Sequence, residues 1–600
     1  MLSSFRHARA FNRTSGCHQI CIMSSGKVWG IGSRLVARKS RYFSASFRPA
    51  PSLSGYATHE WRSTRDAPPI VVPENYNFAR DVVDIHARER PDAVAMVFAH
   101  DSGAVATWSW AQLARRSKQA ANALVAHGLQ RGDRILLISR WHPEVIPLLL
   151  GCIRASIVFI PGTKQLQSKD IEYRVAAARV SCIIASDDVA PRVPANRQVP
   201  LPNLELGSSG AGASGWLSYE NLVDSADVDH KCCDTRSSEP LCWYFTSGST
   251  GNPKIVQHTH TSYPVGHAIG TSPFWLDLAP HDLHWAISDP GWAKSAWSNI
   301  FAPLSCGAAA FILETGFADT GLILDTLASH KITTFCAPPT LWRVLVRDPK
   351  LMQRTFPTLR HCTSAGEPLN PEVTHAWYLA TGIAIREGYG QTESSVLLAT
   401  PRCIECRPGA LGVSVPGYDV RIVDDNGIER PFGEEGNIGV KIKPHWPVGL
   451  FSHYVDDEQK TMSTRAGDFY LTGDRGRQDA DGYFWFEGRA DDVIISKGYR
   501  IGPFEIESVL VEHDTVVEAA VIGVPDYDHG MRVKAFVILS PGGAARDPNE
   551  LKLELKNHCQ ARTAPYKYPR EIEFVKSLPK TVSGKIRRVD LRALSASTGA

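Results

Sequence analysis

Short apolar runs alternate along most of the chain with longer amphipathic segments, in which apolar side chains recur every three or four residues. This periodicity predicts helices over 110–127 and 145–155, because residues three or four apart share one helical face. Strands separated by helices of about ten to fifteen residues indicate βαβ units in covered sheets. Buried strands are accordingly predicted at 134–139, 156–161, 180–185, 241–245, 311–314 and 333–337.

A smaller unit with its own alternation follows residue 489. Pro503 suits the first position of a helix predicted over 504–512. Asp547 and Glu550 form a capping pair that begins a second helix, which extends through Cys559. Strands are predicted at 516–524, 533–539 and 571–575, and a surface loop at 187–216, which is rich in Pro, Gly, Ser and Ala.

The expected fold class is therefore α/β, with two domains of unequal size. The large N-terminal domain, with covered β-sheets, is predicted over residues 70–490. The small C-terminal domain is predicted over residues 491–600 and is of the α+β type.

Charge is distributed unevenly over the 600 residues. Residues 1–59 contain nine Lys or Arg and no Asp or Glu, which leaves 56 basic and 62 acidic residues in the remainder. An Arg- and Ser-rich, acid-free leader is typical of a mitochondrial transit peptide, which we place at residues 1–45. A disordered basic tail and a chloroplast address are the alternatives. The net charge of the remainder is negative, so it gives no support for nucleic-acid binding.

Residues 295–313, an uncharged stretch, do not predict a membrane span. It contains Asn299, Pro303 and Gly307, and it is better explained as a buried helix, a turn and a strand. Cys403 and Cys406 have metal-ligand spacing, but the sequence places no second pair and no histidine near them. The expected location is the mitochondrial matrix, where cysteines stay reduced.

A loop rich in glycine and hydroxyl residues follows the strand predicted at 241–245. It lies in the string Tyr244-Phe-Thr-Ser-Gly-Ser-Thr-Gly-Asn-Pro-Lys254. Glycines let the backbone approach a ligand, and exposed N–H groups, hydroxyls and a lysine can bind phosphate oxygens. The spacing differs from the common P-loop, which has four residues between its glycines. Candidate triphosphate ligands are Thr246, Ser247, Gly248, Ser249, Thr250, Gly251 and Lys254.

Further strings follow this loop in a fixed order: Glu387-Gly-Tyr-Gly-Gln-Thr-Glu393, Tyr470-Leu-Thr-Gly-Asp474, Gly488-Arg-Ala-Asp-Asp492, Ser496-Lys-Gly-Tyr-Arg500 and Pro579-Lys-Thr-Val-Ser-Gly-Lys585. With the loop, they resemble the adenylate-forming (acyl-CoA synthetase) superfamily over residues 70–595. Within that superfamily, the strings at 288–297 and 498–507 look most like the mitochondrial medium-chain acyl-CoA synthetases.

The chemistry of that superfamily requires a cationic site. A carboxylate attacks the α-phosphate of ATP, and a thiol then displaces AMP from the acyl-adenylate. Two unit charges about 4 Å apart interact by roughly 4 kcal/mol at an effective dielectric of about 20, so cations and aimed donors must offset the repulsion. The substrates implied are ATP, coenzyme A and a small carboxylic acid, with Mg²⁺ as the metal ion.

The resemblance also implies roles for individual residues. Thr246 to Lys254 hold the β- and γ-phosphates, Thr392 donates to the α-phosphate, and Glu393 binds Mg²⁺ as a hard oxygen ligand. Asp474 and Arg489 hold the ribose. The adenine slot is implied to contain Gly366, Glu367, Pro368, Glu387, Gly388 and Tyr389, with Tyr389 against the base, and Gly390 and Gln391 complete the nucleotide-binding set.

In this superfamily the small domain takes two orientations. Lys585 is implied to bridge the substrate carboxylate and the α-phosphate, and Asp491 falls at the hinge. After adenylation, Lys497, Gly498, Tyr499 and Arg500 are implied to replace Lys585 and to bind coenzyme A. Lys497 is a departure, because close relatives often carry a small residue there.

The acid is indicated by Gly390 and Trp292. Acetyl-specific relatives carry a tryptophan at the position of Gly390, so glycine implies an open acyl pocket, which Trp292 is expected to line. Such a pocket suits medium-chain or aromatic acids, since each buried CH₂ contributes about 0.8 kcal/mol. Short-chain acids remain compatible. The alternatives are an acetyl- or propionyl-CoA synthetase, a module that loads a separate carrier protein, and a catalytically inactive binding homologue. The sequence leaves the oligomeric state open.

Overall fold

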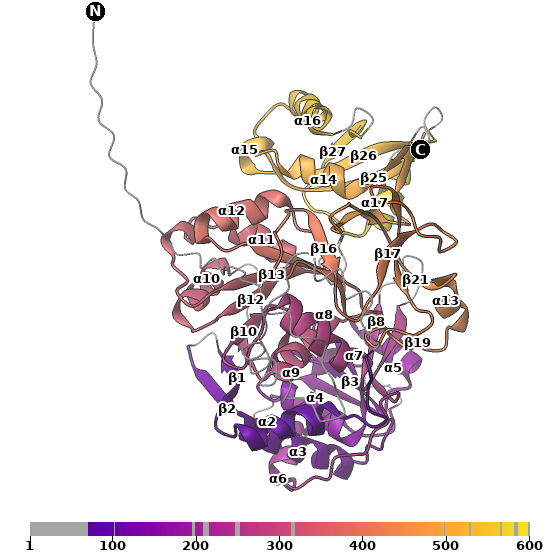
Figure 1. Cartoon of the computed structure of the whole chain (residues 1–600). Coiled ribbons are helices and arrows are strands. Elements are labelled where there is room, and N and C mark those ends of the chain that lie inside the picture. Colours follow the sequence, from indigo (N-terminus) through magenta and orange to yellow (C-terminus); the bar gives the residue numbers. More distant parts are fainter. Residues whose placement is uncertain are drawn as a thin grey trace, which may run out of the picture.

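The fold is seen in a computed structural model, which describes residues 70–100, 103–194, 199–207, 215–246, 253–313, 319–496, 499–526, 530–563, 567–580 and 586–597. Within these residues the strands form three sheets, two in the large domain and one in the small domain. The small domain lies against one end of the large domain (Figure 1). The predicted α/β fold with a large and a small domain is therefore confirmed.

The first sheet of the large domain carries the strand that ends at the phosphate loop. Its order is β19-β9-β8-β4-β3-β5-β6-β7. The predicted strands at 134–139, 156–161, 180–185 and 241–245 are confirmed as β3, β4, β5 and β8. The bounds are β3 Arg134–Ile138, β4 Val158–Gly162, β5 Cys182–Ser186, β6 Asn203–Leu206, β7 Trp216–Ser218, β8 Pro240–Thr246, β9 Lys254–Thr259 and β19 His453–Tyr454.

The surface loop predicted over 187–216 is wrong in part. Asn203–Leu206 forms β6, which runs parallel to β5, and all four of its residues are buried. Four residues between Pro202 and Gly207 are too few to show an alternating pattern, and their pairing with β5 made them a strand.

The second sheet of the large domain has a parallel part, β1-β11-β10-β12-β13-β14, and an antiparallel part from β14 to β17. The strands predicted at 311–314 and 333–337 are confirmed as β11 and β12. The bounds are β1 Val94–Ala99, β2 Val105–Ser109, β10 Leu283–Ala286, β11 Ala309–Leu313, β12 Thr334–Ala337, β13 His361–Ala365, β14 Ile385–Gly390, β15 Val396–Ala399, β16 Ala410–Ser414, β17 Val420–Val423, β18 Glu435–Lys441, β20 Arg465–Ala466, β21 Phe469–Gln478 and β22 Phe484–Arg489.

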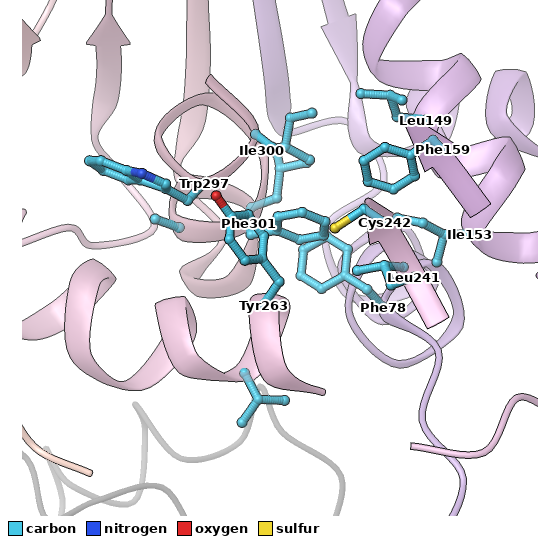
Figure 2. Close-up of a cluster of buried hydrophobic side chains, with 14 of the residues drawn as sticks. Phe78, Leu149, Ile153, Phe159, Leu241, Cys242, Tyr263, Trp297, Ile300 and Phe301 are labelled. Carbon is cyan, nitrogen blue, oxygen red and sulfur yellow. The ribbon is translucent and has the colours of Figure 1, made fainter. Parts of the chain in front are cut away.

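Apolar side chains from helical segments and from strands of the first sheet form a shared core (Figure 2). The Phe301 ring lies 5.0 Å from Phe78 and 5.7 Å from Tyr263, in edge-on geometry in both cases. The bounds of the large-domain helical segments are η3 Ala79–Val83, α2 Asp84–Glu89, α3 Trp110–Ala126, α4 Val145–Ala155, α5 Ser168–Ala178, η4 Ala190–Arg192, α6 Tyr219–Ser225, α7 Ser262–Gly266, η5 His267–Trp275, α8 Ala293–Ala296, η6 Trp297–Phe301, α9 Ala302–Cys306, α10 Thr320–Ser329, α11 Pro339–Leu345, η7 Leu351–Gln353, α12 Pro371–Thr381 and α13 Glu458–Ser463.

The uncharged stretch 295–313 has the predicted internal structure. Helical turns run through η6 and α9, Gly307 ends α9 with a φ of +79°, and β11 follows as a buried strand. Only glycine adopts this φ without steric cost, which explains the turn. In the part of the chain that the structure describes, no helix has the length and apolar character of a membrane span.

The small domain has one sheet of order β24-β23-β26-β25, with β27 parallel to β26. The predicted helix start is confirmed, because the Asp547 side chain accepts from the backbone N–H groups of Asn549 and Glu550. The strands predicted at 516–524, 533–539 and 571–575 and the helix at 504–512 are also confirmed. The bounds are β23 Ile494–Ser496, β24 Tyr499–Ile501, α14 Pro503–Val511, β25 Val516–Asp526, β26 Gly530–Leu539, α15 Pro541–Ala544, α16 Pro548–Arg562, β27 Glu571–Phe574 and α17 Arg588–Ser597.

Candidate active site

The phosphate loop connects β8 to β9, and the two residues at its base pair with each other. Thr246 is the last residue of β8, and it stands opposite Lys254, the first residue of β9. Ser247, Gly248, Ser249, Thr250 and Gly251 lie outside the described residues. The Lys254 ammonium lies 5.8 Å from the centroid of the Tyr454 ring. The Tyr454 hydroxyl in turn donates to Oε1 of Glu393 at 2.8 Å.

This geometry brings the predicted phosphate lysine and the predicted metal carboxylate to one corner of the site. Burial lowers the pKa of Lys254, as does Lys460, whereas Asp457, Glu393 and Asp491 act in the opposite direction. The influence of Asp491 shows that the predicted hinge residue lies close enough to act on the lysine electrostatically.

The backbone of Thr392 is held by a histidine that the sequence did not indicate. Nε2 of His258, on β9, lies 2.7 Å from the carbonyl oxygen of Thr392, and Nδ1 lies 3.0 Å from Oγ of Ser262. Burial lowers the pKa of His258 to about 4, so the ring is neutral at physiological pH. Because the Thr392 carbonyl oxygen can only accept, Nε2 carries the hydrogen of the neutral ring. The available signal was a histidine within the strand segment 254–259.

Asp474 is the centre of a hydrogen-bond network that joins three segments. Its Oδ2 accepts from the Tyr389 hydroxyl at 2.6 Å and from Nε2 of Gln391 at 2.8 Å. Its Oδ1 lies 3.2 Å from Nη1 of Arg489, which is its direct partner across β21 and β22. The Asp474 side chain is 6% exposed and that of Arg489 is 50% exposed. The charge of Asp474 is the largest cause of the raised pKa of Arg489. The Asp474 carboxyl is thus fixed at the joint between β14 and the β21–β22 pair.

The predicted adenine-slot residues lie at the carboxyl ends of β13 and β14. Gly366 follows β13 with a φ of +116°, and a Cβ built on it would meet no atom within 4 Å. Glu367 pairs with Arg343 at 3.2 Å, and Pro368 follows it. A Cβ on Gly388 would lie 2.5 Å from the ring of Trp275, so glycine permits this close packing.

Glu387 is a buried carboxyl. Its Oε2 accepts from the Leu369 N–H at 3.1 Å, and burial raises its pKa to about 8. Its carboxyl therefore supports the backbone that carries the slot.

We expect the Glu387→Gln substitution to flatten the pH dependence of stability. The folded carboxyl keeps its proton up to about pH 8, whereas the unfolded one ionises near its ordinary value of 4.5. The folded state therefore binds more protons in this window, and stability falls as pH rises through it, by up to about 1.4 kcal/mol per pH unit. Thermal unfolding between pH 5 and 8 measures the slope. Glu458→Gln, at an exposed carboxylate of α13, is the control. An unchanged slope in Glu387→Gln would contradict the assignment.

The two predicted acyl-pocket residues lie on separate segments. Trp292 precedes α8 and is partly buried, and its backbone N–H donates to the Asp289 carbonyl at 3.1 Å. Gly390 ends β14, and a Cβ built on it would lie 2.5 Å from the carbonyl oxygen of Ser395. The absence of a side chain at 390 therefore also serves a close backbone approach, which the sequence did not reveal.

The predicted hinge contacts α17, the last helix among the described residues. Nη2 of Arg592, on α17, lies 2.5 Å from Oδ1 of Asp492 and 3.4 Å from the Asp491 carbonyl oxygen. Arg588 pairs with Glu507 at 2.6 Å and with Asp492 at 3.4 Å. Of the remaining predictions, Tyr499 is half exposed and Arg500 lies in β24, whereas Lys497, Gly498 and Lys585 lie outside the described residues.

The fold and the site define an adenylate-forming enzyme. The chain belongs to the AMP-binding enzyme family, which it matches over residues 83–448, and the C-terminal domain of these enzymes matches over residues 505–585. It is 47% identical over 528 residues to the human mitochondrial acyl-coenzyme A synthetase ACSM4, covering 87% of this chain and 91% of that protein. It is 45% identical over 530 residues to human mitochondrial ACSM5, with the same coverage. It is thus a member of the acyl-coenzyme A synthetases.

Solved structures show the same fold. An anthranilate CoA ligase, AuaEII, in complex with anthranoyl-AMP has a TM-score of 0.79 at 27% identity, covering 88% of this chain and 99% of that one. A benzoate CoA ligase from Burkholderia xenovorans LB400 has a TM-score of 0.75 at 29% identity, covering 86% and 100%. The predicted superfamily is therefore confirmed.

Proposed function

We propose that this enzyme converts a medium-chain or aromatic carboxylic acid to its coenzyme A thioester, with ATP as the second substrate. One carboxylate oxygen attacks the α-phosphorus of ATP and pyrophosphate leaves. The thiol of coenzyme A then attacks the acyl carbonyl, loses its proton, and displaces AMP. The observation that carries the proposal is the Asp474 network, which fixes a buried carboxylate beside Tyr389 and Arg489 where the nucleotide sugar is expected.

The adenylation step depends on cations and donors that face the phosphates. Thr246 and Lys254 stand at the two ends of the loop that we assign to the β- and γ-phosphates. Thr392 donates to the α-phosphate, and its backbone is fixed by His258. Asp474 and Arg489 grip the ribose, and Tyr389 lies against the base. These roles follow the superfamily pattern, and the contacts support them.

Glu393 suits the role of a Mg²⁺ ligand. Among the described residues no cluster of three or more His, Cys, Asp or Glu could hold a metal by itself. That fits Mg²⁺, which is bound through one or two carboxylates together with substrate phosphates. The Tyr454 hydroxyl donates to Oε1 of Glu393 and orients the carboxylate. When bound, the ion neutralises phosphate charge.

The small domain supplies different residues to the two steps. Asp491 is the proposed hinge, and Arg592 binds its carbonyl oxygen. Lys585 serves adenylation, and Lys497, Gly498, Tyr499 and Arg500 serve coenzyme A binding after the domain turns. We place the domain boundary at residues 490/491 and the transit peptide at residues 1–45. The location is the mitochondrial matrix, in keeping with the mitochondrial names of the relatives.

The acyl pocket is tested by comparing two substitutions of Gly390. We expect Gly390→Trp to shift preference from hexanoate toward acetate, because the indole closes the pocket. Both Gly390→Trp and Gly390→Ala must displace the Ser395 backbone, which lies 2.5 Å from a built Cβ. Both should therefore lose about 1–3 kcal/mol of stability. Relative kcat/KM for the two acids measures the change in acyl preference, and the Tm of each variant measures the loss of stability. An unchanged chain-length profile in Gly390→Trp would refute the pocket assignment.

The proposed reaction is tested with a panel of acids. The purified chain is given ATP, Mg²⁺, coenzyme A and straight-chain acids from acetate to tetradecanoate, together with aromatic acids, and AMP and pyrophosphate are measured. We expect the highest kcat/KM for medium-chain or aromatic acids. A maximum at acetate or propionate would favour the short-chain alternative. Release of ADP, or no AMP with any acid, would overturn the proposal.

A further inference from the structure

Lys294 is a partly buried lysine whose ammonium has no carboxylate partner among the described residues. It is the second residue of α8, two positions after Trp292, and its Nζ donates to the carbonyl oxygen of Ala365 at 3.3 Å. Across the described part of the chain, no carboxylate oxygen lies within ion-pair distance of this nitrogen. An ammonium has three N–H donors, so donors remain for a further acceptor.

Burial has the largest effect on the pKa of Lys294 and lowers it, whereas the charges of Cys336 and Glu367 act to raise it. The Glu367 carboxylate is already paired with Arg343 at 3.2 Å. Burial acts through the loss of hydration around a cation, a cost that a hydrogen-bond acceptor would offset.

The ammonium lies beside the elements that carry the two proposed acyl-pocket residues. Ala365 is the last residue of β13 and stands opposite Gly388, which precedes Tyr389 and Gly390 on β14. The next residue, Gly366, faces open space, since a Cβ built there would meet no atom within 4 Å. Nζ therefore lies between α8, which begins after Trp292, and the end of β13, which pairs with the strand that ends at Gly390.

We propose that Lys294 makes this enzyme select acids whose chain or ring carries a hydrogen-bond acceptor oxygen over unsubstituted acids of the same length. A hydrocarbon chain laid against the ammonium removes water from its N–H groups and offers them nothing in return. A carbonyl or hydroxyl oxygen on the acyl group restores that partner. The inference rests on the proposed function and names a substrate class for it.

The test compares hexanoate with 4-oxohexanoate and 5-oxohexanoate in the wild-type enzyme and in Lys294→Met. Methionine keeps the unbranched shape and removes the donors. The kcat/KM ratio of oxo acid to hexanoate is measured by AMP release. We expect it to fall about tenfold in Lys294→Met for the oxo acid whose oxygen reaches Nζ, as for the loss of one buried hydrogen bond to a charged group. The ratio does not depend on the fraction of folded enzyme, because all acids are assayed on one preparation.

The control is Lys331→Met, at an exposed lysine shortly before β12, which should leave the ratio unchanged. If Lys294→Met is insoluble, Lys294→Gln, which retains a neutral donor, should show a smaller fall. An unchanged ratio for both oxo acids overturns the inference. An equal loss for all three acids also overturns it, and would assign Lys294 to the reacting carboxylate or to folding. Failure of the proposed function is distinct, because wild-type enzyme would then release no AMP with any acid.

Discussion

Replacement of Lys585 by alanine is expected to lower the rate of acyl-adenylate formation by at least about 10²- to 10³-fold. Thioester formation from supplied acyl-adenylate should stay nearly intact. The physical reason is that the ammonium neutralises charge as a carboxylate oxygen approaches the α-phosphorus, whereas the thiol attacks after that bond is made. Pyrophosphate release with ATP and acid measures the first step, and coenzyme A consumption with synthetic acyl-adenylate measures the second.

A matched control for Lys585 lies five residues earlier. Nζ of Lys580 pairs with Glu518 at 2.9 Å, and Lys580 forms a β-bridge with Ile586, the residue that follows Lys585. Its charge is therefore engaged inside the small domain. Lys580→Ala should leave the two steps in their normal proportion. Equal loss of both steps in Lys585→Ala would contradict the role that we propose for this lysine.

Replacement of Asp474 by alanine is expected to remove ATP binding and to lower stability together. The Tyr389 hydroxyl and Nε2 of Gln391 lose their common acceptor, at about 1–3 kcal/mol for each donor left without a partner. Arg489 is half exposed, so the loss of its ion pair adds little. Calorimetric titration with ATP and thermal unfolding measure the two effects. The free energy of unfolding should fall by about 2–6 kcal/mol.

Two further variants separate the roles of Asp474. Asp474→Asn keeps an oxygen acceptor without the charge, so it should recover part of the stability and little of the ATP affinity. Asp468→Ala removes an exposed carboxylate that pairs with Lys443 just before β21, and it should change neither property. Normal ATP affinity in Asp474→Ala, at lowered stability, would show that the network supports the fold alone.

The order of elements and the superfamily follow from the sequence, because both depend on local signals. Alternating short apolar runs and helical periodicity identified β3, β4 and β5, and Asp547 marked the start of α16. The phosphate loop and the strings around Glu393 and Asp474 resembled one superfamily, to which the chain belongs. Asp474 and Arg489 were assigned to the same ribose, and they are direct partners across β21 and β22.

Tertiary structure decided which distant residues meet. β6 became a strand through its pairing with β5, because four residues carry too little pattern of their own. His258 contacts the Thr392 carbonyl oxygen across a separation of 134 residues in the sequence. The Lys294 ammonium donates to the Ala365 carbonyl oxygen across a separation of 71 residues. The sequence by itself determined the periodic elements and the motifs, since each is written in neighbouring residues. The partners of buried polar groups were set only when the sheets packed, because a hydrogen bond depends on the distance between atoms in the folded chain.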